Sequence, residues 1–236
     1  MNPTRIITSL SSKNIERQTY CLNTWKQYGL PIVAVQTEGE SALLQEHFPG
    51  VEFIETSLGG DYFGKPHLPR ISELINQSVD SPILLINSDI SIEDTQREFI
   101  NNWKQDGLVC GIRLNHRRPD STRVKRNPFG IDAFKIPQGT IVEDYGFCIG
   151  MPGWDYFLPY ELAHRKVPIY VSQSNLLHLI HEVNYEDQYI KLGQQLLIDT
   201  YGHDQRYFTV AVQKLTHRQR MNYRNTSPQD FVWREL

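Results

Sequence analysis

The chain has 236 residues, of which 39% are hydrophobic, and a formal net charge of -3 at neutral pH. This length and apolar content suffice for one sizeable packed domain, and the slight acidity argues against a protein that wraps nucleic acid. Cys21, Cys110 and Cys148 lack the spacing of a zinc site or a disulfide framework. No run approaches the roughly 20 apolar residues of a membrane span, so we expect a cytoplasmic protein without a transmembrane segment.

The first half alternates apolar strand patterns with helix patterns. Strands are predicted at 5–10, 31–36, 51–55 and 81–90, and helices at 15–28, at 40–47 and from 71 to about 79. Asn14 and Gly29 are suited to begin and end the first helix. This β-α-β-α-β order is typical of a doubly wound, mainly parallel α/β sheet with helices on both faces.

The second half is more mixed. We predict helices at 93–105, 154–165 and 184–201, and strands at 108–114, 131–136, 147–153, 169–171 and 175–181. The strand at 147–153 is expected to end in a glycine-rich turn. The polar stretch 115–127 is predicted to be a surface loop. The basic run from Arg113 to Arg126 is either a solvated face or a lid that orders over a diphosphate donor or an anionic acceptor. We expect a single domain over 1–236, with halves at about 1–106 and 107–202 and a polar C-terminal extension at 203–236.

The apolar run from Ser81 ends in Asn87, Ser88 and Asp89. A run of this kind is typical of a strand buried on both faces, and open α/β sheets bind ligands at the carboxyl ends of such strands. A carboxylate there can hold Mg²⁺ or Mn²⁺, which in turn can hold a diphosphate. The same residues could instead cap a helix. This segment alone leaves both interpretations open.

Two further polar clusters follow apolar segments. One is Gly153, Trp154 and Asp155, and the other is His178 with His181. Carboxylate and imidazole groups that converge from separate elements suit Mn²⁺. Residues three apart on an ideal strand face opposite sides, so both histidines can bind one ion only if the strand bends or ends between them. The alternatives are a helix cap for Asp155, a core position for Trp154 and hydrogen-bonded packing for the histidines.

The order of these motifs resembles the GT-A fold of nucleotide-sugar glycosyltransferases over roughly residues 5 to 185. In that family a DXD motif binds the metal of the metal–nucleotide-sugar complex, and 87–89 stands in its place. The resemblance implies that Asp89 is a metal ligand, that Asn87 contacts the ribose, and that His178 and His181 complete the shell of Mn²⁺ or Mg²⁺. Asn87 departs from the family pattern, which has Asp at that position.

The resemblance also implies the substrate contacts. The 153–155 segment is similar to the acidic region of β-1,4-galactosyltransferase-like enzymes, which implies that Asp155 is the base for the acceptor hydroxyl and that Trp154 offers a flat face to a sugar. The first half would then bind the nucleotide sugar and the second half the acceptor, a carbohydrate or another hydroxyl-bearing compound. The remaining expected nucleotide-sugar contacts are Thr8, Ser9, Lys65, Arg70, Ser88 and Asp132.

The implied activity is metal-dependent transfer of a sugar from a nucleoside diphosphate, UDP first, to an acceptor hydroxyl. Asp155 as base implies inversion, and a retaining reaction stays open. One alternative is a non-catalytic nucleotide-sugar-binding protein of the same fold, which Asn87 favours. Another is a sugar nucleotidyltransferase, although the segment after the first strand lacks a glycine-rich phosphate loop. Nucleic-acid binding is not expected, because the basic stretch is short and has no interleaved aromatic residues.

Overall fold

One mixed sheet organises the computed structural model, which describes residues 4–60, 68–94, 97–101, 106–116, 124–179 and 187–202. In the described residues its strand order is β3-β2-β1-β6-β9-β8-β10-β7. A separate antiparallel pair joins β4 (Gly59–Gly60) to β5 (Leu68–Pro69). The strands of the main sheet are β1 (Arg5–Thr8), β2 (Ile32–Thr37), β3 (Glu52–Thr56), β6 (Ile83–Ile86), β7 (Ile90–Ser91), β8 (Leu108–His116), β9 (Val124–Ile136) and β10 (Ile169–Leu179).

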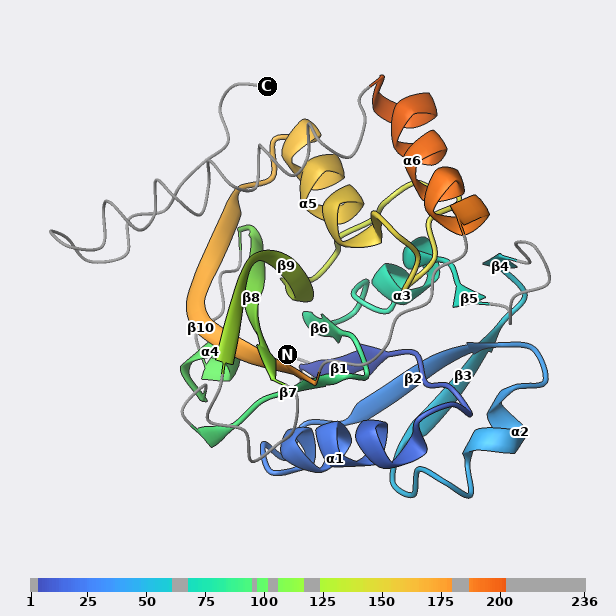
Figure 1. The fold of residues 1–236 in the computed structure, drawn as a ribbon, viewed down its shortest axis with the longest axis vertical. Coiled ribbons are helices and arrows are strands. Elements are labelled where there is room, and N and C mark those ends of the chain that lie inside the picture. Colours follow the sequence, from blue (N-terminus) through green and yellow to red (C-terminus); the bar gives the residue numbers. More distant parts are fainter. Residues whose placement is uncertain are drawn as a thin grey trace, which may run out of the picture.

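Helices cover both faces of this sheet (Figure 1). One apolar cluster joins a face of the sheet to α3 (Ile71–Asn76), α5 (Trp154–His164) and α6 (Asp187–Tyr201). A second cluster joins the opposite face to α1 (Ile15–Lys26), α2 (Ser41–Leu44) and α4 (Arg97–Asn101). The predicted arrangement of helices on both faces is therefore confirmed.

The two halves of the sheet differ in strand direction. Strands β3, β2, β1 and β6 run parallel, as the alternating pattern predicts. Strand β9 then lies antiparallel between β6 and β8, while β10 runs parallel to β8. This confirms the predicted α/β class, with a Rossmann-like first half and a mixed second half. The apolar run of β6 is buried along its whole length, which fits its central place.

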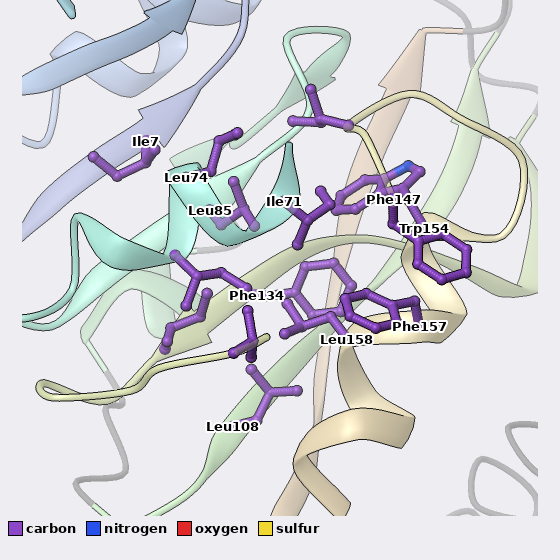
Figure 2. Packing of buried hydrophobic residues seen from close by; sticks show 14 of the residues in the cluster. Ile7, Ile71, Leu74, Leu85, Leu108, Phe134, Phe147, Trp154, Phe157 and Leu158 are labelled. Atoms are coloured by element: carbon purple, nitrogen blue, oxygen red, sulfur yellow. The ribbon is translucent and has the colours of Figure 1, made fainter. Parts of the chain in front are cut away.

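Aromatic packing fixes α5 against the sheet. Figure 2 shows Trp154 and Phe157 of α5 among the side chains of the first cluster. The Trp154 ring meets Phe134 of β9 edge to face, with ring centroids 5.5 Å apart, and Phe157 stacks on Phe147 at 4.5 Å. Such pairs contribute about 0.5–1.5 kcal/mol beyond the area that they bury. They hold the start of α5 close to β9.

The prediction of a surface loop at 115–127 is wrong at both ends of that stretch. Strand β8 continues to His116 and β9 begins at Val124, and the two strands pair there as an antiparallel ladder. Residues 117–123 lie outside the described residues. The sequence obscures this hairpin because its polar, basic residues do not show the apolar alternation by which a strand is recognised.

Two other strand predictions need correction. Over the predicted strand 147–153 the described structure has one isolated bridge, between Cys148 and Arg70, because Gly150 and Gly153 have positive φ angles that turn the chain. The two strands predicted at 169–171 and 175–181 form one strand, β10, with a register shift between Ser172 and Asn175. The described helices include none with the length and apolar character to cross a bilayer.

Gly193→Ala is expected to destabilise the fold, because a Cβ on Gly193 of α6 would lie 2.1 Å from the carbonyl oxygen of Pro152, just before α5. The chain must rearrange to avoid that clash, and this rearrangement should lower the free energy of unfolding by about 1–3 kcal/mol. Urea unfolding measures the change, with the exposed Lys191→Ala of the same helix as a control expected within about 0.5 kcal/mol of wild type. Equal stability of Gly193→Ala and wild type would contradict this close packing.

Candidate active site

The turn after β6 carries the first group of the site. The Ile90 backbone N–H donates to the Asn87 carbonyl at 3.1 Å, and the chain then enters β7. Because a strand rather than a helix follows Asp89, the helix-cap interpretation of this turn is wrong. The predicted position of Asn87, Ser88 and Asp89 at the carboxyl end of a buried strand is confirmed.

Helix α1 fixes the segment that follows this turn. The Trp25 indole donates to the Ile90 carbonyl at 2.8 Å, and the Thr24 hydroxyl accepts from the Ile92 N–H at 3.0 Å. Gln27 donates to the Ile92 carbonyl at 2.9 Å. Three side chains of the helix and its C-terminal end thus satisfy backbone groups of the segment after Asp89, and one of them, Trp25, is a residue that a hydrophobic pattern would assign to packing alone. The turn is held from one side by α1 and from the other by β10, which pairs with β7.

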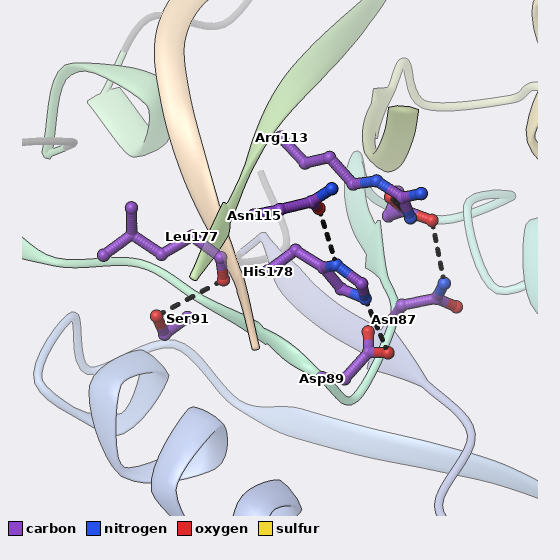
Figure 3. Close-up of polar contacts among 8 residues, drawn as sticks. Asn87, Asp89, Ser91, Arg113, Asn115, Leu177 and His178 are labelled. Carbon is purple, nitrogen blue, oxygen red and sulfur yellow. Dashed lines mark hydrogen bonds and ion pairs between the residues drawn. The ribbon is translucent and has the colours of Figure 1, made fainter. Parts of the chain in front are cut away.

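His178 lies between Asn115 and Asp89 (Figure 3). The strand register places His178 beside Asn115 of β8 and beside Ile90 of β7. Its Nδ1 is 2.8 Å from Asn115 Oδ1, and its Nε2 is 3.2 Å from Asp89 Oδ2. Two residues 89 positions apart, both expected to be metal ligands, are therefore in direct contact.

The geometry of this pair fits a divalent cation. Asn115 Oδ1 accepts hydrogen bonds, so the Nδ1–H of His178 is the donor in this pair. Nε2 then faces the Asp89 carboxylate, and a ring without a proton on Nε2 could share a cation with that carboxylate. Ligand atoms about 2.1 Å from one ion and at a right angle to each other lie roughly 3 Å apart, close to the separation found here.

The described residues contain no cluster of three or more His, Cys, Asp or Glu side chains arranged to hold a metal. Mg²⁺ is often held by only one or two carboxylates, with water and substrate phosphates in its other positions. An ion at Asp89 and His178 would likewise need other oxygen ligands to complete its coordination. The third expected ligand, His181, lies outside the described residues.

Asp132 joins the turn to the middle of the sheet. Because Ile86 pairs with Ala133, Asn87 comes to lie across from Asp132. The Asn87 N–H donates to the Asp132 carbonyl at 3.0 Å, and its amide Nδ2 donates to Asp132 Oδ1 at 3.1 Å. Arg113 Nη1 pairs with the other carboxylate oxygen at 2.5 Å. Asp132 is only 4% exposed, so these partners compensate its loss of water.

A local irregularity in β8 positions Arg113. The register between β8 and β9 shifts on both sides of Ile112, and Arg113 follows directly. Bulges of this kind redirect side chains. A Cβ on Gly130 would lie 2.0 Å from Arg113 Nε, so the missing side chain of that glycine leaves room for the guanidinium. Sequence reasoning placed Arg113 in a surface charge run and missed this role; the glycine was the available signal.

Asp155 lies in the first turn of α5 and is half-buried. Gly153 occupies the N-cap position, and the Asp155 carboxylate accepts hydrogen bonds from the backbone N–H groups of Asp155 and Tyr156, which lower its pKa. Burial raises the pKa of Asp155 to about 8, and the Asp132 carboxylate adds to the rise. Burial also raises the pKa of Asp132, a rise that the Arg113 guanidinium opposes. Asp155 therefore titrates close to neutral pH, where a general base is most effective.

Other expected contacts fall in different places. Trp154 is 3% exposed and packs in the core, so its expected role as an open platform for a sugar is wrong. Thr8 is buried at the end of β1, and the Ser9 hydroxyl donates to Gln36 Oε1 at 2.9 Å. Arg70 Nη1 lies 3.4 Å from Asp144 Oδ1, and Ser88 is half-buried in the turn beside Asp89. Lys65 lies outside the described residues.

Comparisons with known proteins give fold neighbours. No protein-family model matches the chain, and no curated protein matches it. Among solved structures it is similar to an inositol-1-phosphate CTP transferase of T. maritima, with 12% identity, a TM-score of 0.40, and coverage of 83% of this chain and 97% of that one.

Two further neighbours have the same level of identity. A protein named as a glucose-1-phosphate thymidylyltransferase of Bacillus anthracis has 12% identity and a TM-score of 0.35, with coverage of 79% of this chain and 98% of that one. The CTP:phosphocholine cytidylyltransferase of Streptococcus pneumoniae has 12% identity and a TM-score of 0.30, covering 82% and 98%. Similarity at this level carries no argument about activity.

Asp155→Asn is expected to stabilise the fold near pH 8. Between the ordinary carboxyl pKa of 3.8 and the folded-state pKa of about 8, the folded protein keeps a proton that the unfolded chain releases. The free energy of unfolding therefore falls as pH rises through this window. An amide does not titrate, so the variant should exceed wild type by about 1 kcal/mol or more at pH 8 and by much less at pH 4.

Urea unfolding at both pH values measures this difference. The exposed Asp199→Asn of α6 is the matched control and is expected to show no such pH-dependent gain. If Asp155→Asn were no more stable than wild type at pH 8, the raised pKa of Asp155 would be contradicted.

Proposed function

We propose that this chain is a GT-A-like glycosyltransferase that moves a sugar from a nucleoside diphosphate, UDP first, to a hydroxyl of a carbohydrate or another acceptor. One observation carries the proposal: Asp89 Oδ2 and His178 Nε2 converge to 3.2 Å at the end of a buried central strand. Asp132, in the next strand of the sheet, couples electrostatically to Asp155. This electrostatic link supports the assignment of Asp155 to the same site as the Asp89–His178 pair.

A divalent cation, Mn²⁺ or Mg²⁺, held by Asp89 and His178 would neutralise the negative charge of the diphosphate leaving group. Asn115 supports this role by orienting the imidazole ring of His178, because its hydrogen bond with Nδ1 leaves Nε2 as the nitrogen that would bind the cation. Helix α1 supports it by fixing the backbone just after Asp89.

Asp155 would act as the base in a single displacement. The acceptor oxygen forms a bond to the anomeric carbon while the bond from that carbon to the diphosphate oxygen breaks, and its electron pair leaves with the nucleoside diphosphate. The hydroxyl proton passes to the Asp155 carboxylate. A group with a pKa of about 8 is partly ionised at neutral pH and retains the proton once it is transferred. This geometry of attack inverts the anomeric carbon.

The loop after β1 favours this reaction over nucleotidyl transfer. The Leu10 N–H donates to Gln36 Oε1 at 2.8 Å, and the Ser11 N–H donates to Gln18 Oε1 at 2.9 Å. The Lys13 N–H donates to the Ser11 hydroxyl at 3.1 Å. A loop that cradles a triphosphate needs such backbone N–H groups to point at the ligand. Here three of them are used within the loop and by two glutamines.

Product analysis tests the proposal. The protein is incubated with a panel of nucleotide sugars and Mn²⁺, with and without simple sugar acceptors. Release of a nucleoside diphosphate, faster with an acceptor, is the expected result. Pyrophosphate formed from a nucleoside triphosphate and a sugar phosphate would indicate a nucleotidyltransferase instead, and donor binding without turnover would indicate a non-catalytic binding protein.

Asp155→Asn is expected to lower turnover by roughly 10²–10⁴-fold, because the amide cannot accept the acceptor proton. Donor affinity, measured by calorimetry, should change little, since Asp155 is not among the proposed metal ligands. Wild-type turnover should rise with pH toward a plateau above the Asp155 pKa of about 8. Near-normal turnover of Asp155→Asn, with Asp199→Asn as the matched control, would show that another group is the base.

A further inference from the structure

Asn87 occupies the position at which the GT-A pattern has a first metal-binding carboxylate. In the structure its side chain is directed at Asp132. It donates through Nδ2 to Asp132 Oδ1 at 3.1 Å, while its backbone N–H donates to the Asp132 carbonyl at 3.0 Å. These two bonds extend the pairing of β6 with β9 by one residue beyond the end of β6.

Position 87 requires an amide because Asp132 lies opposite it. Asp132 is 4% exposed, and its second carboxylate oxygen pairs with Arg113 at 2.5 Å. A carboxylate at position 87 would have no hydrogen to donate and would face a buried carboxylate oxygen at hydrogen-bond distance. Like charges so close in a site sheltered from water repel strongly. An aspartate is therefore incompatible with this arrangement of Asp132.

We propose that Asn87 is a positioning residue rather than a metal ligand lost from the motif. It anchors the 87–89 turn to Asp132, and so holds Asp89 where its carboxylate meets His178. The protein side of the metal site then consists of one carboxylate and one imidazole, while both carboxylate oxygens of Asp132 are engaged by Asn87 and Arg113. The metal part of this inference rests on the proposed function, whereas the anchor rests on the hydrogen bonds alone.

The anchor acts on Asp89 through a short, fixed path. Asn87 is bound to β9, and the Asp89 carbonyl accepts from the Leu179 N–H of β10 at 3.1 Å. Arg113 continues the chain of contacts from Asp132 into β8, which also carries Asn115. The turn is therefore tied on both sides to the strands that carry the groups around His178.

A reciprocal exchange tests the anchor. Asn87→Asp, Asp132→Asn and the double variant are compared with wild type by thermal unfolding without ligand, and Mn²⁺ affinity is measured by electron paramagnetic resonance without nucleotide. Asn87→Asp is expected to lower the Tm and to weaken Mn²⁺ binding about 10-fold. Adding Asp132→Asn to that variant should raise the Tm and the Mn²⁺ affinity again, because the hydrogen-bond donor and acceptor are then exchanged. Asp132→Asn alone is expected to lower the Tm.

Asn76→Asp, at the exposed end of α3, controls for an added negative charge and is expected to change neither quantity. Tighter Mn²⁺ binding by Asn87→Asp than by wild type would overturn the proposal, because it would identify position 87 as a metal ligand. Additive effects in the double variant would overturn it as well.

Should Asn87→Asp fail to fold, Asn87→Ala removes the donor without adding charge. It is expected to weaken Mn²⁺ binding about 10-fold, and unchanged affinity would overturn the proposal. Wild-type protein that binds no Mn²⁺ either alone or with UDP would contradict the metal site of the proposed function. The Tm values of the exchange series would still decide the anchor between Asn87 and Asp132.

Discussion

The antiparallel placement of β9 between β6 and β8 is the constraint on which the site depends. It puts Asp132 across from Asn87 on one side and within reach of Arg113 on the other. The 87–89 turn is thereby fixed to the sheet before any ligand binds. Parallel pairing of β8 with β10 then brings Asn115 and His178 to the same edge.

The electrostatics of the site follow from this strand order. Asp132 lies at its centre, buried, and its charge is compensated by the nearby guanidinium of Arg113. Although burial opposes it, the carboxylates of Asp132 and Asp155 raise the pKa of Arg113, which therefore stays protonated. Asp155, with no such ion pair among the described contacts, is the carboxyl whose pKa burial moves to about 8. Burial thus raises the pKa of both neighbouring carboxyl groups, and the Arg113 guanidinium opposes the rise in each.

Local patterns predicted the parts of the molecule that depend on local burial. The apolar runs of β1, β2 and β6 were recognisable, and the position of Asp89 at the end of β6 followed from them. The expectation that Asp89 and His178 bind one ion came from the resemblance, and in the structure the two side chains are in contact. Neither inference required knowledge of the strand register.

The parts that were missed depend on register and on long-range contacts. The polar residues at the start of β9 do not alternate, so the hairpin with β8 was taken for a loop. The bulge that directs Arg113 at Asp132, and the hydrogen bond that explains Asn87, arise only when β6, β8 and β9 are side by side. Trp154 was misassigned because an aromatic residue beside an acidic one has the same local pattern in a binding site and in a core.

The central claim is that Asp89 and His178 hold the cation of a nucleotide diphosphate complex. Anomalous scattering from crystals of the protein grown with Mn²⁺ and UDP tests it most directly. The account predicts a manganese peak about 2–2.3 Å from both Asp89 Oδ2 and His178 Nε2, with diphosphate oxygens completing its coordination. Bound UDP with the manganese elsewhere, or with no manganese at this pair, would contradict it.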